Sequence, residues 1–126
     1  MYTSYFANVK KLPADLEPVS IARGTPPWAG KIRRELRLAP TQEMLKFMTA
    51  AQYDRAYAAI LKALDPAEIA RDLGDKAVLL CWEAANVKFC HRRVAAEWLE
   101  SELGIVVPEY GFERKQTLSW KKLRKL

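Results

Sequence analysis

The sequence predicts one small α/β domain, a three-layer Rossmann-like fold around a short, mostly parallel β-sheet. The first observation is the continuous apolar run at 77–81, which is typical of a strand buried on both faces of a parallel sheet. The second is the helical pattern and the further apolar run that follow it, because strand, helix and strand at this spacing form a parallel crossover. The third is size, since 126 residues, 50% of them hydrophobic, are enough to close one core.

The N-terminal third predicts two strands and a loop. Residues 3–9 are rich in β-branched and aromatic types and contain no Gly or Pro, so we expect a strand there. Residues 18–22 form a second apolar run. The segment 23–28 holds a glycine and two adjacent prolines, which place a loop directly after that strand. Residues 30–40 are basic and weakly patterned, and a short helix is expected over 42–48.

Helix start and stop signals follow in the middle of the chain. Thr49, with Gln52 three residues later, forms a capping box, and the apolar spacing behind it predicts the longest helix of this region. Asp65 repeats the start signal as an N-cap, with Pro66 at the first helical position. Gly74 supplies the stop.

The last part of the predicted domain is the crossover itself. After the strand at 77–81, a helix is expected to begin near 90–92 and to end at Gly104, and a further strand is expected at 105–107. This order brings the carboxyl end of a strand and the first turn of a helix to the same edge of the sheet.

The positive charge is concentrated at the C-terminus. The whole chain carries +6, and residues 113–126 hold six basic residues against one acid, so that segment accounts for +5. We therefore divide the chain into an α/β domain at 1–112 and a basic C-terminal tail at 113–126. The tail is a candidate contact for nucleic acid or for an acidic partner, although basic runs are more often solvated. Leucines and Trp120 among its lysines suggest that part of it packs as an amphipathic helix.

Composition also predicts the compartment. No apolar run reaches the length of a membrane span, and the first residues lack the pattern of a secretory signal, so we expect a cytoplasmic protein that does not contact a membrane. A reducing compartment disfavours a disulfide, and we expect Cys81 and Cys90 to be free thiols.

Polar and reactive residues gather where this fold class binds ligands, which is beyond the carboxyl ends of parallel strands and beside helix N-termini. Three separate segments deliver them: the end of the second strand, the end of the strand at 77–81, and the start of the next helix. The predicted site residues are Arg23, Thr25, Cys81, Trp82, Glu83, Cys90, His91 and Arg92.

These residue types favour an anionic ligand. The first turn of a helix exposes unpaired N–H groups, and the guanidinium groups of Arg23, Arg92 and Arg93 add positive charge to them. We expect Arg23 and Arg92, together with Thr25 and Trp82, to contact the ligand.

Four residues are candidates for a chemical role. Cys90 is the better nucleophile of the two cysteines, since a helix start and a protonated His91 stabilise a thiolate. Glu83 is a candidate general base or a ligand for a ribose-type hydroxyl pair. Cys81 completes the catalytic set. The sequence indicates no particular cofactor.

Each of these residues also has a plainer interpretation. Cys81 can be a small buried hydrophobe, Glu83 an ion-pair partner of an arginine, and His91 a helix cap, while Arg93 is expected to point to solvent. A zinc site formed by Cys81, Cys90, His91 and Glu83 is a minority alternative.

The motif residues resemble a known family. Leu79-Leu80-Cys81-Trp82-Glu83 and Phe89-Cys90-His91-Arg92-Arg93-Val94-Ala95 are similar to the leucine-cysteine-x-glutamate and cysteine-histidine-arginine signature of the domain of unknown function 488 family. Ser20-Ile21-Ala22-Arg23-Gly24-Thr25-Pro26-Pro27-Trp28 and Leu38-Ala39-Pro40 resemble its short branch from bacteria and their phages. The resemblance covers about residues 3–107. It implies a compact α/β fold and marks Arg23, Cys81, Glu83, Cys90, His91 and Arg92, but it implies no reaction.

Two functional hypotheses follow besides the zinc alternative. In the first, the domain binds a nucleotide, a nucleoside or a nucleic-acid end in a pocket at these residues, and the sequence leaves open whether it is an enzyme. In the second, it is a non-catalytic module that binds nucleic acid or an acidic protein through the tail and the basic residues Lys31, Arg33, Arg34 and Arg37.

Overall fold

The computed structural model describes residues 1–83, 91–112 and 120–126. Its centre is a parallel sheet in the order β1-β4-β2-β3. The strands are β1 (Tyr2–Tyr5), β2 (Glu17–Ser20), β3 (Arg33–Arg34) and β4 (Ala77–Cys81). The helices are α1 (Gln42–Phe47), α2 (Ala50–Lys62), α3 (Pro66–Leu73), α4 (His91–Leu103) and α5 (Trp120–Leu123), with 3₁₀ turns η1 (Phe6–Lys11), η2 (Pro27–Ala29) and η3 (Leu36–Leu38). The small α/β fold class is therefore confirmed.

Strand β4 is an inner strand of the sheet and is fully buried. Its residues pair with β1 on one side and with β2 on the other, for example Leu79 with Thr3 and with Val19. This is the arrangement that a continuous apolar run predicts, because both faces of such a strand are covered.

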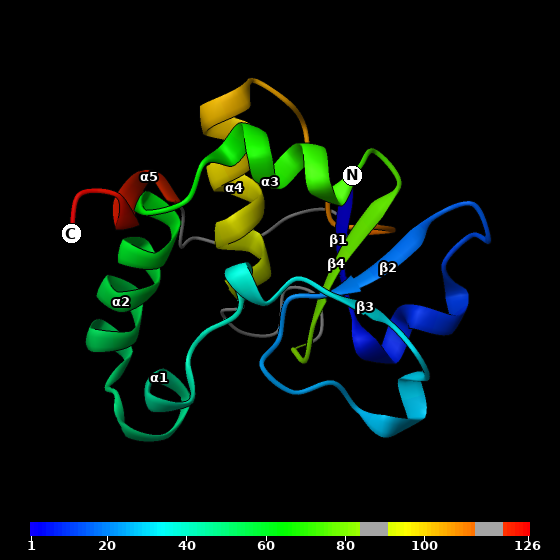
Figure 1. Cartoon of the computed structure of the whole chain (residues 1–126), viewed down its shortest axis with the longest axis horizontal. Coiled ribbons are helices and arrows are strands. Elements are labelled where there is room, and N and C mark those ends of the chain that lie inside the picture. Colours follow the sequence, from blue (N-terminus) through cyan, green and yellow to red (C-terminus); the bar gives the residue numbers. More distant parts are fainter. Residues whose placement is uncertain (84–90, 113–119) are drawn as a thin grey trace.

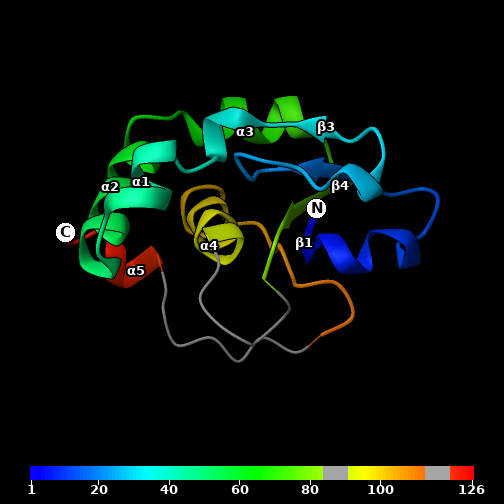
Figure 2. The same ribbon diagram turned by 90° about the horizontal axis from the view of Figure 1, so that it is seen from below.

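Helices cover both faces of the sheet, but unequally. Figure 1 and Figure 2 show α4 lying between the sheet and the group formed by α1, α2 and α5. Leu79 and Val19 face this larger core, together with Trp98 and Leu99 of α4. Val78 and Leu80 face a smaller core that η1 covers with Phe6. The domain thus has three layers, the second face being covered by a 3₁₀ segment; the Rossmann-like label stays a prediction.

The helix signals read from the sequence are confirmed. The side chains of Thr49 and Gln52 each accept from the other's backbone N–H at the start of α2. Asp65 caps α3 through the N–H groups of Ala67 and Glu68, and Gly74 ends that helix with a φ of 83°.

Two strand predictions need correction. The predicted strand at 3–9 ends at Tyr5 and turns into η1, where the Asn8 side chain donates to Ser4 Oγ instead of continuing the ladder. The predicted strand at 105–107 is wrong. Side chains satisfy the backbone of Val107, since its N–H donates to Glu100 Oε2 and its carbonyl accepts from Arg93 Nη1. The chain meets β1 two residues later, through a single parallel bridge between Thr3 and Glu109.

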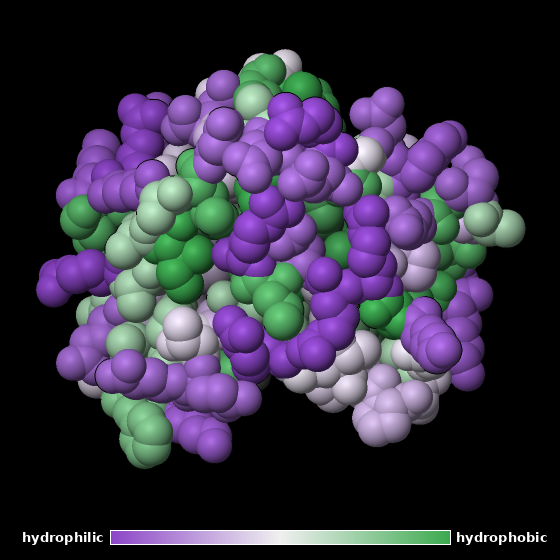
Figure 3. Space-filling view, viewed as in Figure 1, coloured by the Kyte–Doolittle hydropathy of each residue, from purple (hydrophilic) through white to green (hydrophobic). Residues whose placement is uncertain are grey.

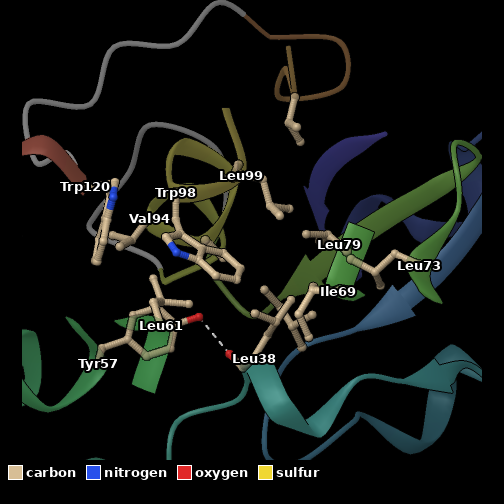
Figure 4. Close-up of a cluster of buried hydrophobic side chains, with 14 of the residues drawn as sticks. Leu38, Tyr57, Leu61, Ile69, Leu73, Leu79, Val94, Trp98, Leu99 and Trp120 are labelled. Carbon is tan, nitrogen blue, oxygen red and sulfur yellow. Dashed lines mark hydrogen bonds between the residues drawn. The ribbon is translucent and has the colours of Figure 1, made fainter. Parts of the chain in front are cut away.

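The basic tail is partly a structural element. Trp120 and Leu123 of α5 are each only 3% exposed and belong to the main core, as Figure 4 shows for Trp120 beside Trp98 and Val94. The prediction of an amphipathic helix is confirmed for these residues, and the division at residue 112 does not separate the tail from the core. Among the described residues, no helix combines the length and the apolar character needed to cross a membrane.

Candidate functional site

A cavity of about 370 Å³ lies where β2 and β4 end and α4 begins. Helices α1 and α2 form its other wall. Predicted site residues and residues from these two helices share its lining, which consists of Ala22, Arg23, Gly24, Pro40, Met44, Leu45, Met48, Thr49, Ala50, Tyr53, Asp54, Trp82, Glu83 and His91. The structure thus brings Arg23, Trp82, Glu83 and His91 together at one hollow, at the sheet edge that the sequence indicated.

Arg23 is the positively charged side chain among the described residues of the cavity wall. It follows β2 in the loop, and its Nε donates to the carbonyl of Pro40 at 2.9 Å. That bond fixes the base of the guanidinium group. Within the described part of the chain, its terminal nitrogens Nη1 and Nη2 have no hydrogen-bond or ion-pair partner, so they are available to a ligand.

Two further bonds hold the loop that carries Arg23. The indole Nε1 of Trp82 donates to the Gly24 carbonyl at 3.0 Å, and Arg34 Nη2 donates to the carbonyl of Arg23 itself. Trp82 also packs edge-to-face on Phe6, with the ring centroids 5.3 Å apart, while 53% of the residue stays exposed. An oriented indole at a cavity wall is a surface against which a planar ligand can stack.

Glu83 places a carboxylate directly after β4. Its Oε2 lies 3.8 Å from Cys81 Sγ, and no described cation pairs with the carboxylate. The plainer interpretation of Glu83 as an ion-pair partner of Arg23 or Arg92 is therefore wrong for its side chain. Its backbone carbonyl, in contrast, accepts from Arg92 Nη1.

His91 is a neutral group at the start of α4. It is 7% exposed, and its Nε2 lies 2.7 Å from the carbonyl of Ile21. Burial and, to a smaller extent, the charge of Arg92 lower the pKa of His91 to about 4. Because a carbonyl only accepts, Nε2 must carry the ring proton, which leaves Nδ1 as an acceptor. With this lowered pKa, His91 is expected to be neutral at pH 7, so the protonated imidazole predicted beside Cys90 is not expected there.

Helix α2 adds two groups that sequence reasoning missed. Tyr53 and Asp54 line the cavity one turn after the Thr49 cap. Burial raises the pKa of Asp54, and burial together with the charges of Glu83 and Asp54 raises that of Tyr53. The capping box was the available signal for the helix, but nothing local in the sequence indicated that this helix faces the sheet edge.

The charge balance of the cavity differs from the prediction. Among the described lining residues, Arg23 is the one cationic side chain and Asp54 and Glu83 are two carboxylates, so this part of the wall is acceptor-rich rather than wholly positive. Its remaining lining is largely apolar and includes Met44 and Met48. A complementary ligand has one anionic group, several hydrogen-bond donors and an apolar or planar part.

Arg92 does not belong to this cavity. Its side chain is fully buried, and it forms a two-bond ion pair with Glu109, with Nε–Oε1 at 3.1 Å and Nη2–Oε2 at 2.8 Å. Nη1 donates to Cys81 Sγ at 3.0 Å. The prediction that Arg92 binds the ligand is therefore corrected: its donors are already used inside the protein. Arg93 is also buried, donating to Thr3 Oγ1, so it neither points to solvent nor cradles an anion.

The structure tests the prediction of a free thiol for Cys81 but not for Cys90. Cys81 is fully buried and disulfide-bonded, so the expectation of a free thiol is wrong for this residue, and it is not available as a nucleophile. Cys90 lies outside the described residues. A zinc site at these residues would need the Cys81 sulfur as a thiolate, but that sulfur is held in a disulfide. The part of the chain that the structure describes holds no suitable group of three metal ligands.

The remaining predicted residues lie near the cavity or away from it. Thr25 is outside the lining and donates to Ser20 Oγ at 3.0 Å, which stabilises the loop. Arg33 and Arg37 are paired with acidic side chains, so the basic stretch at 30–40 is partly neutralised. Lys121, Lys122, Arg124 and Lys125 are exposed at the C-terminus.

Because His91 is buried, we expect the stability of the domain to depend on pH. Its folded-state pKa of about 4 lies below the unfolded value of 6.5, so the unfolded chain binds the proton first and acid favours unfolding. We expect the titration of His91 to lower the free energy of unfolding by about 2 kcal/mol between pH 7 and pH 5, with little further loss below pH 4. Urea unfolding of the wild type and of His91→Gln at both pH values measures it. A pH dependence that is the same in both proteins contradicts the assignment.

Comparisons with known proteins identified no relative of this chain. No protein-family model matches the sequence, and neither curated proteins nor solved structures give a match. The similarity to the domain of unknown function 488 family therefore stays a prediction carried by the motif residues.

Proposed function

We propose that the cavity binds a nucleoside monophosphate or a closely similar small molecule. The observation that supports this most directly is the pair of unpartnered terminal nitrogens of Arg23, in the same cavity as an exposed indole. A guanidinium group with two free nitrogens can bind a phosphate or carboxylate through two parallel hydrogen bonds. The cavity volume lies within the usual range for small-molecule sites.

The other wall residues complement the rest of such a ligand. Trp82 offers its ring to a planar base, and Met44 and Met48 provide adaptable apolar contacts. Because the cavity also holds Asp54 and Glu83, further phosphate groups would meet like charge, which favours a monophosphate over a triphosphate. If the complex is reactive, Glu83 is the residue placed to act as a general base.

Replacing Arg23 by glutamine tests the proposal. Isothermal titration with adenosine, guanosine and their 5′-monophosphates should show that the wild type prefers the monophosphates. In Arg23→Gln we expect this preference to fall by about 10- to 100-fold, because a charge-assisted hydrogen-bond pair is lost, while nucleoside binding changes little.

Arg71→Gln is the matched control, since Arg71 is an exposed arginine on α3 that does not line the cavity. It should bind all four compounds as the wild type does. The proposal fails if none of them binds the wild type, or if Arg23→Gln keeps the full preference for the phosphate group.

A further inference from the structure

Acceptor groups from three different parts of the chain line the same cavity as Arg23. Asp54 comes from α2, Glu83 from the segment after β4 and His91 from the start of α4. Among the described residues, neither carboxylate has a hydrogen-bond or ion-pair partner that would satisfy it. Two unpaired carboxylates in a partly buried wall are costly unless a ligand or water donates to them.

The histidine adds an independent observation that the two carboxylates do not supply. It is more than nine-tenths buried, and its Nε2 is committed to the Ile21 carbonyl. Its T-shaped packing on Tyr57, with ring centroids 5.4 Å apart, fixes the plane of the ring. The free position Nδ1 has no partner within the described residues, and it can only accept a hydrogen bond while the ring is neutral.

We propose that Asp54, Glu83 and His91 form an acceptor wall that binds the hydroxyl pair of a ribose and so selects ribonucleotides over deoxyribonucleotides. This inference rests on the proposed function. With the phosphate on Arg23, the adjoining donors of a nucleotide are its sugar hydroxyls, and carboxylates accept from such pairs. A deoxy ligand would leave a desolvated acceptor without a donor, which costs more than the loss of one ordinary contact.

The test compares adenosine 5′-monophosphate with its 2′-deoxy and 3′-deoxy forms by titration calorimetry on the full chain. We expect the wild type to bind the ribonucleotide about tenfold or more tightly than at least one deoxy form. Asp54→Asn and Glu83→Gln should reduce that ratio. Glu43→Gln is the control, because Glu43 is an exposed acid on α1 outside the lining.

The outcomes separate the two proposals. Equal binding of the ribo and deoxy forms, with the preference for the phosphate group intact, overturns the acceptor wall and leaves the proposed function standing. If the wild type prefers neither the phosphate group nor the ribose, both the proposed function and the acceptor wall are overturned. The ratio of the wild-type affinities for the ribonucleotide and its deoxy forms is decisive even if a variant fails to fold. If Asp54→Asn and Glu83→Gln leave this ratio unchanged, that result also contradicts the acceptor wall.

Discussion

Replacing Glu109 by glutamine is expected to lower the free energy of unfolding by about 3–5 kcal/mol. Glu109 and Arg92 form a two-bond ion pair in which the side chains are 4% and 0% exposed. The substitution keeps the shape of the side chain but removes the charge that balances the guanidinium group. A buried cation without a counter-charge is strongly destabilising, even where the intact pair itself adds little net stability. Urea unfolding monitored by circular dichroism measures the change.

An exposed pair of the same chemistry provides the control. Arg33 and Glu17 lie 3.3 Å apart with side chains 40% and 47% exposed, and solvent screens their attraction. Glu17→Gln should therefore cost about 1 kcal/mol or less. Equal effects of Glu109→Gln and Glu17→Gln would show that Arg92 does not depend on its buried partner.

The double variant Arg92→Met and Glu109→Gln tests whether the unpaired charge of Arg92 causes the loss of stability. Methionine fills much of the space of the arginine stem and leaves no charge behind. We expect it to recover part of the stability lost in Glu109→Gln, because no unpaired ion remains in the core. The same result would assign Arg92 to the structure of the domain rather than to ligand binding.

Arg23 and Arg92 show what sequence reasoning could and could not decide. Both lie at the predicted sheet edge, and their residue type is the same. What separates them is a partner, Glu109, that is 17 residues beyond Arg92 and reaches it only because the chain after α4 returns to β1. The extended pattern at 105–107 indicated a return to the sheet, but not which residue would meet β1.

Local signals were reliable where local physics decides the outcome. The cap at Thr49, the stop at Gly74 and the buried strand β4 depend on neighbouring residues, and the structure confirms each of them. The α2 wall of the cavity could not be predicted in the same way. Tyr53 and Asp54 read as ordinary residues of an amphipathic helix, and only the packing of α2 in the folded domain places them in the lining of the same cavity as Arg23 and Glu83.

Replacing Trp120 by alanine should cost about 3–5 kcal/mol, although this residue belongs to the basic tail. Its side chain is 3% exposed and packs in the main core near Val94, Trp98 and Leu61 (Figure 4). The backbone N–H of Trp120, which alanine would keep, donates to Glu97 Oε2 at 2.8 Å and ties the start of α5 to α4. The loss combines the transfer of a large apolar group with the cavity that it leaves. Thermal and urea unfolding measure the change.

A tryptophan outside the core makes the comparison specific. Trp28 is 53% exposed, so Trp28→Ala should cost about 1 kcal/mol or less. Similar effects of the two substitutions would mean that α5 does not close the core.

The position of Trp120 also decides how a role of the tail charges must be tested. Polar side chains cover much of the face shown in Figure 3. The basic residues of the described part of the tail are exposed. Deleting the tail would remove Trp120 and Leu123 from the core, so any loss of nucleic-acid binding would be confounded by unfolding. Changing Lys121, Lys122, Arg124 and Lys125 to glutamine removes four charges and should alter stability by only about 0.5 kcal/mol per site. Salt-dependent binding that disappears in this variant would therefore report on charge alone.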